Sequence, residues 1–207
     1  MALKRNRIIG DIILALIPGL IAMAFTWGLG VLTNLAYLLV MALIFDLSVT
    51  KIKSSEFANF SDNYLTSALT VLLITICLPP YVDFSVLFVA CIASLGLARE
   101  AYGGIGHNVF NPAMVGYAVI LVAYPEQLAI WPEIKQGQLD GYSGATLLTE
   151  FKYRDSLTVE EFNSLHLAAS QSGILISTAF LSGGLFLLAR KIITWHIPLT
   201  MIACTTL

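Results

Sequence analysis

The chain has 207 residues, of which 57% are hydrophobic and only 12% are charged, and its formal net charge at pH 7 is −2. A soluble domain carries about 25% charged residues, so this composition excludes a water-soluble globule, and the abundance of apolar residues excludes a disordered chain. The lack of a basic excess argues against a nucleic-acid partner. We therefore predict an all-α, polytopic integral membrane protein in contact with membrane lipid.

Apolar runs follow one another along the chain, and about 20 residues are needed to span a bilayer as a helix. We expect spans at residues 8–27, 30–48, 64–82, 84–99, 109–125 and 173–190. Another apolar run starts at Ile197 and reaches the last residue, so we expect the natural protein to continue beyond it. The chain then divides into a membrane region (1–125), a polar loop (126–172) and the start of a second membrane region (173–207).

Lysine and arginine are distributed unequally between the two sides of these spans. With the N-terminus in the cytoplasm, three of the 11 basic residues, Lys135, Lys152 and Arg154, fall outside and all others fall inside. The positive-inside rule therefore predicts a cytoplasmic N-terminus and an extracytoplasmic loop 126–172. A loop of this length in a compact protein usually carries function.

The loop contains a segment, Asp140–Thr146, that has two interpretations. In the first, it is a turn in which Ser143 or Thr146 caps a helix. In the second, Gly144 and Ala145 are small enough to let another enzyme approach the Thr146 hydroxyl, while Asp140 holds the loop or a metal. The residues alone leave both interpretations open.

A second segment, 102–113, is rich in glycine and lies on the predicted cytoplasmic side. Its glycines permit positive φ and a close approach of the backbone, and Asn111 before Pro112 marks a break or a helix start. A tight interhelical turn and a non-helical stretch lining a cofactor cavity are both compatible with this pattern. A dinucleotide-binding loop is excluded because no strand precedes it. The candidate cofactor-binding residues are Gly103, Gly104, Gly106, Asn108 and Asn111.

Other chemically active groups have simpler explanations. Cys77, Cys91 and Cys204 lie in apolar runs without a CxxC pair, so we expect inert thiols and no metal site. No side chain is predicted to act as a catalytic nucleophile or base. Asp11 lies near the basic N-terminal arm, so pairing with that arm or extension to the membrane interface explains its charge. For Asp46, we expect Lys51 and Lys53 to compensate the charge.

The Asp140–Thr146 segment resembles Asp-x-x-Ser/Thr-Gly-Ala-Thr, the target of flavin transferases, and matches it at all five fixed positions. These enzymes take FAD and attach FMN to the final threonine as a phosphoester. Segment 103–113 resembles a signature of the family that contains RnfD of the Rnf complexes and NqrB of the sodium-pumping NADH:quinone reductase. The segment Trp195–Leu199, the short N-terminal arm and His107, where the quinone reductase protein usually has arginine, favour the Rnf branch.

The resemblance implies a fold of ten spans in two inverted five-span repeats, of which this chain holds the first and part of the second. It further implies an electron-carrier subunit, not an enzyme by itself, in a bacterial inner membrane. FMN would be covalently bound to Thr146, riboflavin is a candidate second cofactor, and the partners would be Rnf subunits A, B, C, E and G and a flavin transferase. The alternatives are the NqrB protein of the quinone reductase, a solute channel with a fold like that of urea transporters, and a flavin-free scaffold.

Overall fold

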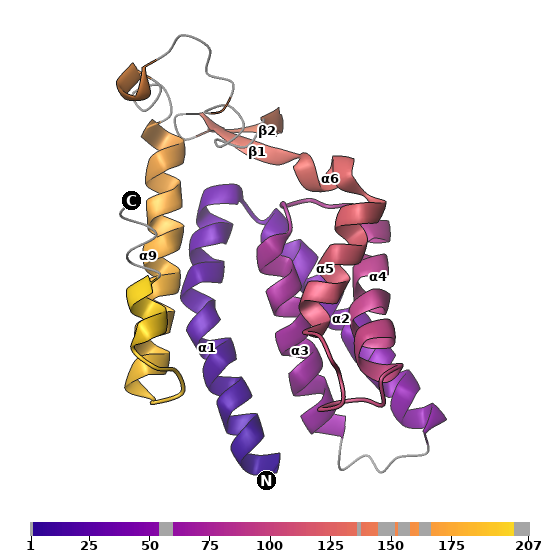
Figure 1. Cartoon of the computed structure of the whole chain (residues 1–207). Coiled ribbons are helices and arrows are strands. Elements are labelled where there is room, and N and C mark those ends of the chain that lie inside the picture. The colour runs from indigo at the N-terminus through magenta and orange to yellow at the C-terminus, as the bar shows by residue number, and fades with distance from the viewer. Residues whose placement is uncertain are drawn as a thin grey trace. The chain divides into compact units, whose positions relative to one another are not determined.

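The computed structural model describes residues 2–53, 60–135, 138–144, 152, 158–161 and 167–200. These residues form an all-α membrane protein with one small β-hairpin, which confirms the predicted fold class (Figure 1). The helices are α1 (Ala2–Trp27), α2 (Gly30–Ile52), α3 (Phe60–Cys77), α4 (Phe84–Cys91), α5 (Pro112–Ala123), α6 (Pro125–Ala129) and α9 (Leu167–Ala189). A π-helical segment, η2 (Ile92–Glu100), directly continues α4.

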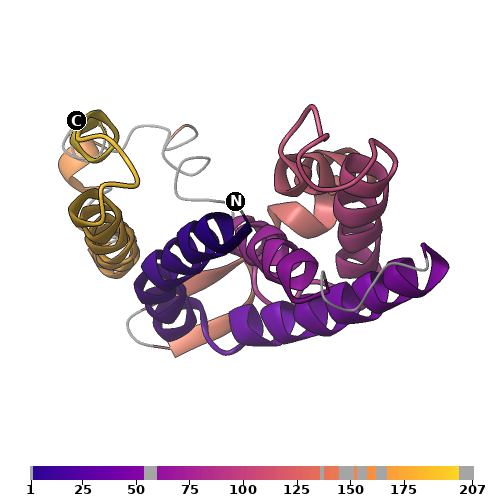
Figure 2. The same cartoon turned by 90° about the horizontal axis from the view of Figure 1, so that it is seen from below.

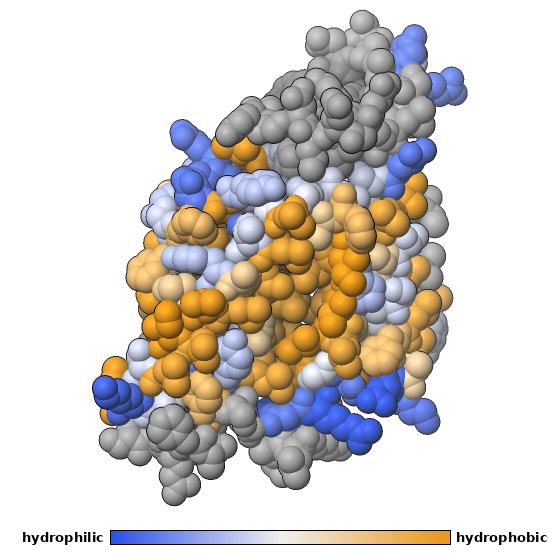
Figure 3. Space-filling model, turned by 180° about the vertical axis from the view of Figure 1, so that it is seen from behind, coloured by the Kyte–Doolittle hydropathy of each residue, from blue (hydrophilic) through white to orange (hydrophobic). Residues whose placement is uncertain are grey.

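Three of these helices contain stretches that are long and apolar enough to cross a membrane, namely Arg5–Trp27, Gly30–Ile52 and Gln171–Ala189. They coincide with the predicted spans 8–27, 30–48 and 173–190. The other predicted spans correspond to shorter helices, α3, α4 with η2, and α5. Figure 3 shows apolar side chains across the middle of one face, with hydrophilic side chains gathered toward its margins. This distribution is the one expected of helices that cross a bilayer.

The chain forms two compact units, and the first comprises Met1–Ile13 and Gly30–Leu128. In this unit α2 packs against α3 and α4, while α5 packs against α3, α4 and η2 (Figures 1 and 2). Apart from Gly30 and Val31 at its start, the buried residues of α2 recur every four positions, as Asn34, Leu38, Ala42, Asp46 and Thr50. This spacing places them on one face of the helix, so a single stripe of α2 faces its neighbours.

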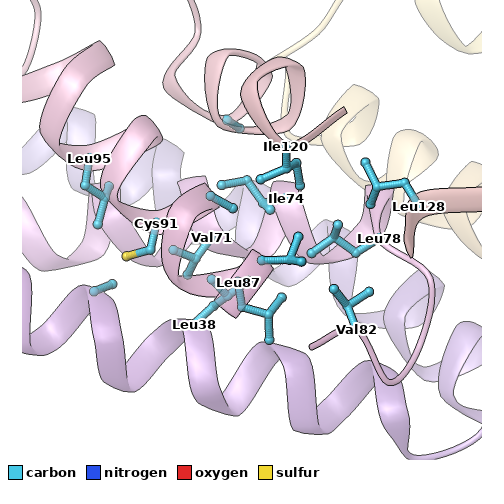
Figure 4. Packing of buried hydrophobic residues seen from close by; sticks show 14 residues of the cluster. Leu38, Val71, Ile74, Leu78, Val82, Leu87, Cys91, Leu95, Ile120 and Leu128 are labelled. Carbon is cyan, nitrogen blue, oxygen red and sulfur yellow. The ribbon is translucent and has the colours of Figure 1, made fainter. Parts of the chain in front are cut away.

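The core of the first unit is formed by side chains from the helices around it, including Leu38, Ile74, Leu87, Leu95 and Ile120 (Figure 4). Lipid tails are as apolar as leucine, so within a bilayer close packing, and not removal from water, holds such helices together. Gly116 on α5 serves this purpose. A Cβ at this position would lie 2.9 Å from the carbonyl oxygen of Ala90 and 2.9 Å from the Cβ of Ser94.

We expect Gly116→Ala to lower the stability of the first unit by about 1–2 kcal/mol, because the added methyl group forces α5 away from α4 and η2. The matched control is Gly184→Ala on α9, where a Cβ would meet no atom within 4 Å. In a helix interior this change removes the entropic cost of glycine and is expected to be neutral or stabilising. Thermal unfolding of both variants in detergent measures the difference, and equal melting temperatures would contradict this prediction.

The second unit comprises Leu14–Leu29 and Ala129–Leu207. Here the second half of α1 approaches α9 closely, since a Cβ on Gly183 would lie 1.9 Å from the carbonyl oxygen of Ala15. Gly19 leaves room for the ring of Phe180 in the same way. Small residues that let two backbones approach are typical of packed helices in membranes.

The second unit also contains a two-stranded antiparallel sheet, formed by β1 (Trp131–Lys135) and β2 (Gln138–Gly144). We expected a loop in this region and predicted no strands. A signal was present in the sequence, because Gln136 and Gly137 alone separate the two strands, and glycine favours a two-residue hairpin connection. The backbone pairing of the two strands places Glu133 opposite Asp140 and Lys135 opposite Gln138.

Beyond the hairpin, the structure describes Lys152 and a short helical segment that begins after Thr158. The backbone N–H and the hydroxyl of Thr158 donate to Oε2 of Glu161 at 3.0 and 2.9 Å. The backbone N–H of Glu161 in turn donates to the Thr158 hydroxyl oxygen at 3.3 Å. This reciprocal arrangement is a capping box, and its hydrogen bonds hold the pKa of the Glu161 carboxyl below its ordinary value.

Candidate functional site

The glycine-rich segment forms a non-helical turn between η2 and α5 in the first unit. Gly103, Gly104 and Gly106 have φ angles of 103°, 95° and 90°. A Cβ at Gly104 or Gly106 would meet no atom within 4 Å, so these positions are not crowded. Glycine is required here because other residues rarely adopt positive φ, which agrees with the backbone freedom expected from the sequence.

Side-chain amides stabilise the far end of this turn. Oδ1 of Asn111 accepts a hydrogen bond from the Ala113 N–H at 3.0 Å, with Pro112 at the first helical position, so Asn111 is the N-cap of α5. The amide nitrogen of Asn108 donates to the Phe110 carbonyl at 3.0 Å. These contacts are those of a capped interhelical turn, and the assignment of the glycines, Asn108 and Asn111 to a cofactor site stays a prediction.

An apolar groove of about 710 Å³ lies beside the turn, between η2 and α5. The turn contributes Tyr102 and Phe110 to its wall, and the remaining lining residues are Leu97, Ala98, Val115, Ala118, Val119, Val122 and Ala123. Its volume falls within the range of about 300–1,000 Å³ usual for small-molecule sites. Its chemistry suits an apolar group, since its walls hold few of the polar groups that would orient a polar ligand.

A buried ion pair between Asp46 and Arg99 joins α2 to η2, close to the point where the glycine-rich turn leaves η2. Nη2 of Arg99 donates to Oδ1 of Asp46 at 2.6 Å, and each side chain is only 2% exposed. The expectation that Lys51 and Lys53 compensate Asp46 is therefore wrong. Lys53 instead pairs with Glu100 at 2.5 Å, where its side chain is 51% exposed. Arg99 is the partner because η2 brings it onto the inward face of the helix, against the buried stripe of α2.

Further groups complete the surroundings of Arg99. The Ser67 hydroxyl of α3 donates to Oδ2 of Asp46 at 2.6 Å and accepts a hydrogen bond from Nη1 of Arg99. Nε of Arg99 donates to Oε1 of Glu100 at 2.9 Å, and the guanidinium carbon lies 5.9 Å from the centre of the Phe45 ring. This cluster was not predicted from the sequence. The sequence did contain a signal for the cluster. Arg99 lies at the edge of the apolar run 84–99, and a charged residue at membrane depth needs a partner.

The flavin-transferase motif lies partly on β2 in the second unit. The strand contains Asp140, Ser143 and Gly144, and its backbone pairs Gly144 with Trp131 and Asp140 with Glu133. Ala145 and Thr146 lie outside the described residues. The described strand thus ends two residues before the predicted flavin acceptor.

The hairpin is attached to the C-terminal end of α1. The indole of Trp131 makes an edge contact with that of Trp27, with 4.9 Å between the ring centres, and Trp27 is the last residue of α1. Arg5 and Arg7 lie in the first turns of the same helix. An α-helix rises about 1.5 Å per residue, so the 26 residues of α1 are longer than the ~30 Å hydrocarbon core of a bilayer.

The chain as a whole has the sequence pattern of a known protein family. Residues 2–207 match the model of the NQR2, RnfD, RnfE family. The chain belongs to this family.

Individual relatives of this family member come from several bacteria, and each is named as the D subunit of an ion-translocating oxidoreductase complex. The chain is 33% identical to that of Ectopseudomonas mendocina, over 97% of this chain and 63% of the relative. The relative from Pseudomonas aeruginosa is 34% identical over 91% of this chain and 60% of its own length. The relative from Cellvibrio japonicus is 32% identical over 99% of this chain and 64% of its own length. The chain thus spans less than two thirds of the length of these relatives.

Proposed function

We propose that this chain is the RnfD-type membrane electron-carrier subunit of an ion-translocating oxidoreductase complex, with FMN attached to Thr146. The observation that carries the proposal is the match of Asp140, Ser143, Gly144, Ala145 and Thr146 to all five fixed positions of the flavin-transferase target. Membership of the NQR2, RnfD, RnfE family and the names of the relatives support the assignment to such a complex.

The position of the hairpin supports an extracytoplasmic motif. The basic arm at the start of α1 favours the cytoplasm by the positive-inside rule. Trp27 at the other end of α1 contacts Trp131 of the hairpin, and the helix between them is long enough to cross the hydrocarbon core. The proposal therefore puts Thr146 outside the cytoplasm, where flavin transferases act.

The local chemistry suits modification by another enzyme. In the proposed reaction the Thr146 hydroxyl oxygen forms a bond to the phosphorus of the FMN half of FAD, AMP leaves, and the transferase takes the hydroxyl proton. Gly144 and Ala145 add almost no bulk beside this oxygen. β2 has one partner strand in the two-stranded sheet, and such an edge leaves backbone groups for a second protein to pair with.

FMN would supply the electron-transfer chemistry, and the chain would hold and orient it. Because the phosphoester joins the ribityl phosphate, the flavin ring stays free, and attachment prevents its loss outside the cytoplasm. In this proposal the complex lies in the bacterial inner membrane, includes subunits A, B, C, E and G, and couples electron flow between ferredoxin and NAD to transport of Na⁺ or H⁺. A second, non-covalent flavin such as riboflavin near the glycine turn belongs to the same proposal.

Mass spectrometry tests the attachment directly. The chain is co-expressed with a flavin transferase, digested with trypsin, and the peptide from Gln136 to Lys152 is analysed. The expected mass is that of the peptide plus one FMN less one water, with fragment ions placing the addition on Thr146. A bare peptide, obtained while the same transferase modifies a target known to accept flavin, would overturn the proposal.

A further inference from the structure

We propose that Arg99 is a positioning residue for the glycine turn. The guanidinium of Arg99, held by Asp46 and Ser67, would fix the end of η2 from which the turn of residues 102–111 departs. The inference concerns the geometry of the first unit and does not rest on flavin attachment at Thr146. In this inference the buried ion pair fixes the start of the glycine turn, and the proposed electron transfer does not depend on that role.

The side chain of Arg99 is held from three helical elements. Asp46 on α2 accepts from Nη2, Ser67 on α3 accepts from Nη1, and Glu100 on η2 itself accepts from Nε. The planar guanidinium presents its donors in a fixed fork, so three simultaneous acceptors determine its position and its orientation. A lysine ammonium, which is a compact point charge, could not meet the same three acceptors in this geometry.

The backbone of the same residue holds the turn. The carbonyl oxygen of Arg99 accepts the Gly104 N–H at 3.0 Å, and that of Glu100 accepts the Gly103 N–H at 3.1 Å. Gly103 and Gly104 are the first two residues of the turn with positive φ. A displacement of Arg99 is therefore transmitted to the turn through hydrogen bonds that the same residue makes.

The π-helical form of η2 makes this arrangement possible. The Ala101 N–H donates to the Gly96 carbonyl at 2.9 Å, five residues back, instead of the four of an α-helix. The wider spacing rotates the side chains at the end of η2 about the helix axis relative to an α-helix. In this rotated position Arg99 points inward, toward Asp46. Relaxation of η2 to α-helical spacing would rotate Arg99 away from Asp46, so the ion pair and the π-helix stabilise each other.

The charge of Asp46 is what keeps Arg99 inside. Both side chains are 2% exposed, and a cation at this depth without its partner is drawn toward water. The remaining carboxylate beside Arg99 is that of Glu100, which is 17% exposed and also binds Lys53. Without Asp46, Arg99 would follow Glu100 toward the exposed edge and carry the start of the turn with it.

Hydrogen exchange, measured by mass spectrometry on the full natural chain in lipid nanodiscs, tests the inference. In Asp46→Asn, which keeps the size of the side chain and removes its charge, we expect amides of the peptide covering residues 101–108 to exchange at least tenfold faster. Amides of α5, which share in the general loss of stability of the first unit, are expected to rise less than those of the turn. Lys53→Gln is the matched control, because it removes the exposed partner of Glu100 and leaves Asp46 and Arg99 paired, and it is expected to leave the turn unchanged.

Two results would overturn the inference. One is unchanged exchange of the turn in folded Asp46→Asn, and the other is an equal rise over α2, α3 and α5, which would make the pair a general structural element only. Should Asp46→Asn fail to fold, Ser67→Ala decides, since it removes one acceptor of Arg99 without leaving a buried charge. A rise of about threefold confined to the turn supports the positioning role, and no rise refutes it.

Discussion

Thr146→Ala is expected to remove all covalent flavin from this chain. The phosphoester needs a hydroxyl oxygen at the last position of the motif, and alanine offers none, so the loss should be complete and not partial. The measurement is flavin fluorescence of the band in a denaturing gel after co-expression with a flavin transferase, since only covalently bound flavin survives denaturation.

The matched control for this experiment is Thr149→Ala, which removes a hydroxyl three residues further along the same segment and is expected to retain full fluorescence. Fluorescence that persists on the Thr146→Ala band would show that another residue accepts the flavin. Its absence from the unaltered chain would favour a flavin-free scaffold or a solute channel of the same fold.

Asp46→Ala is expected to destabilise the first unit by about 3–5 kcal/mol, because the buried Arg99 guanidinium loses its counter-ion and its buried position becomes unfavourable. The Ser67 hydroxyl also loses the carboxylate to which it donates at 2.6 Å. For a chain of this size, a loss of that order corresponds to about 6–20 °C in Tm. Thermal unfolding of the purified chain in detergent measures it.

A double variant separates the charge from the packing. Asp46→Ala combined with Arg99→Ala is expected to lose less than the sum of the two single variants, because no unpaired charge remains. Lys53→Ala, which breaks a pair whose lysine is 51% exposed, should change stability by less than about 1 kcal/mol. An Asp46→Ala variant as stable as Lys53→Ala would refute the importance of the buried pair.

The helices were predictable because their limits are set locally. A helix satisfies its own backbone hydrogen bonds, and the bilayer demands an apolar run, so runs such as 8–27 and 30–48 indicate helices without reference to the rest of the fold. The positive φ of Gly104 and the cap at Asn111 were predictable for the same reason, since they depend on neighbouring residues. The family resemblance, carried by short contiguous motifs, also needed no tertiary contact.

The ion partner of Asp46 could not be predicted in this way. Lys51 and Lys53 are near Asp46 in sequence and were expected to compensate it, yet the structure pairs it with Arg99, 53 residues away. The choice depends on the π-helical spacing of η2 and on the contact of η2 and α3 with one face of α2. The hairpin of β1 and β2 was missed although its sequence signal is local, because region 126–172 was assigned as a loop from its length and polar composition.

By itself, the sequence determined a membrane protein of consecutive helices, its family and the motif that ends at Thr146, because each is encoded in contiguous stretches of residues. Only the tertiary structure decided that Arg99 turns inward to Asp46 and Ser67, that Gly116 brings α5 against α4, and that Trp131 joins the hairpin to Trp27 of α1. Burial, close packing and ion pairing depend on which side chains meet in space, and residues far apart in a sequence carry no local mark of that meeting.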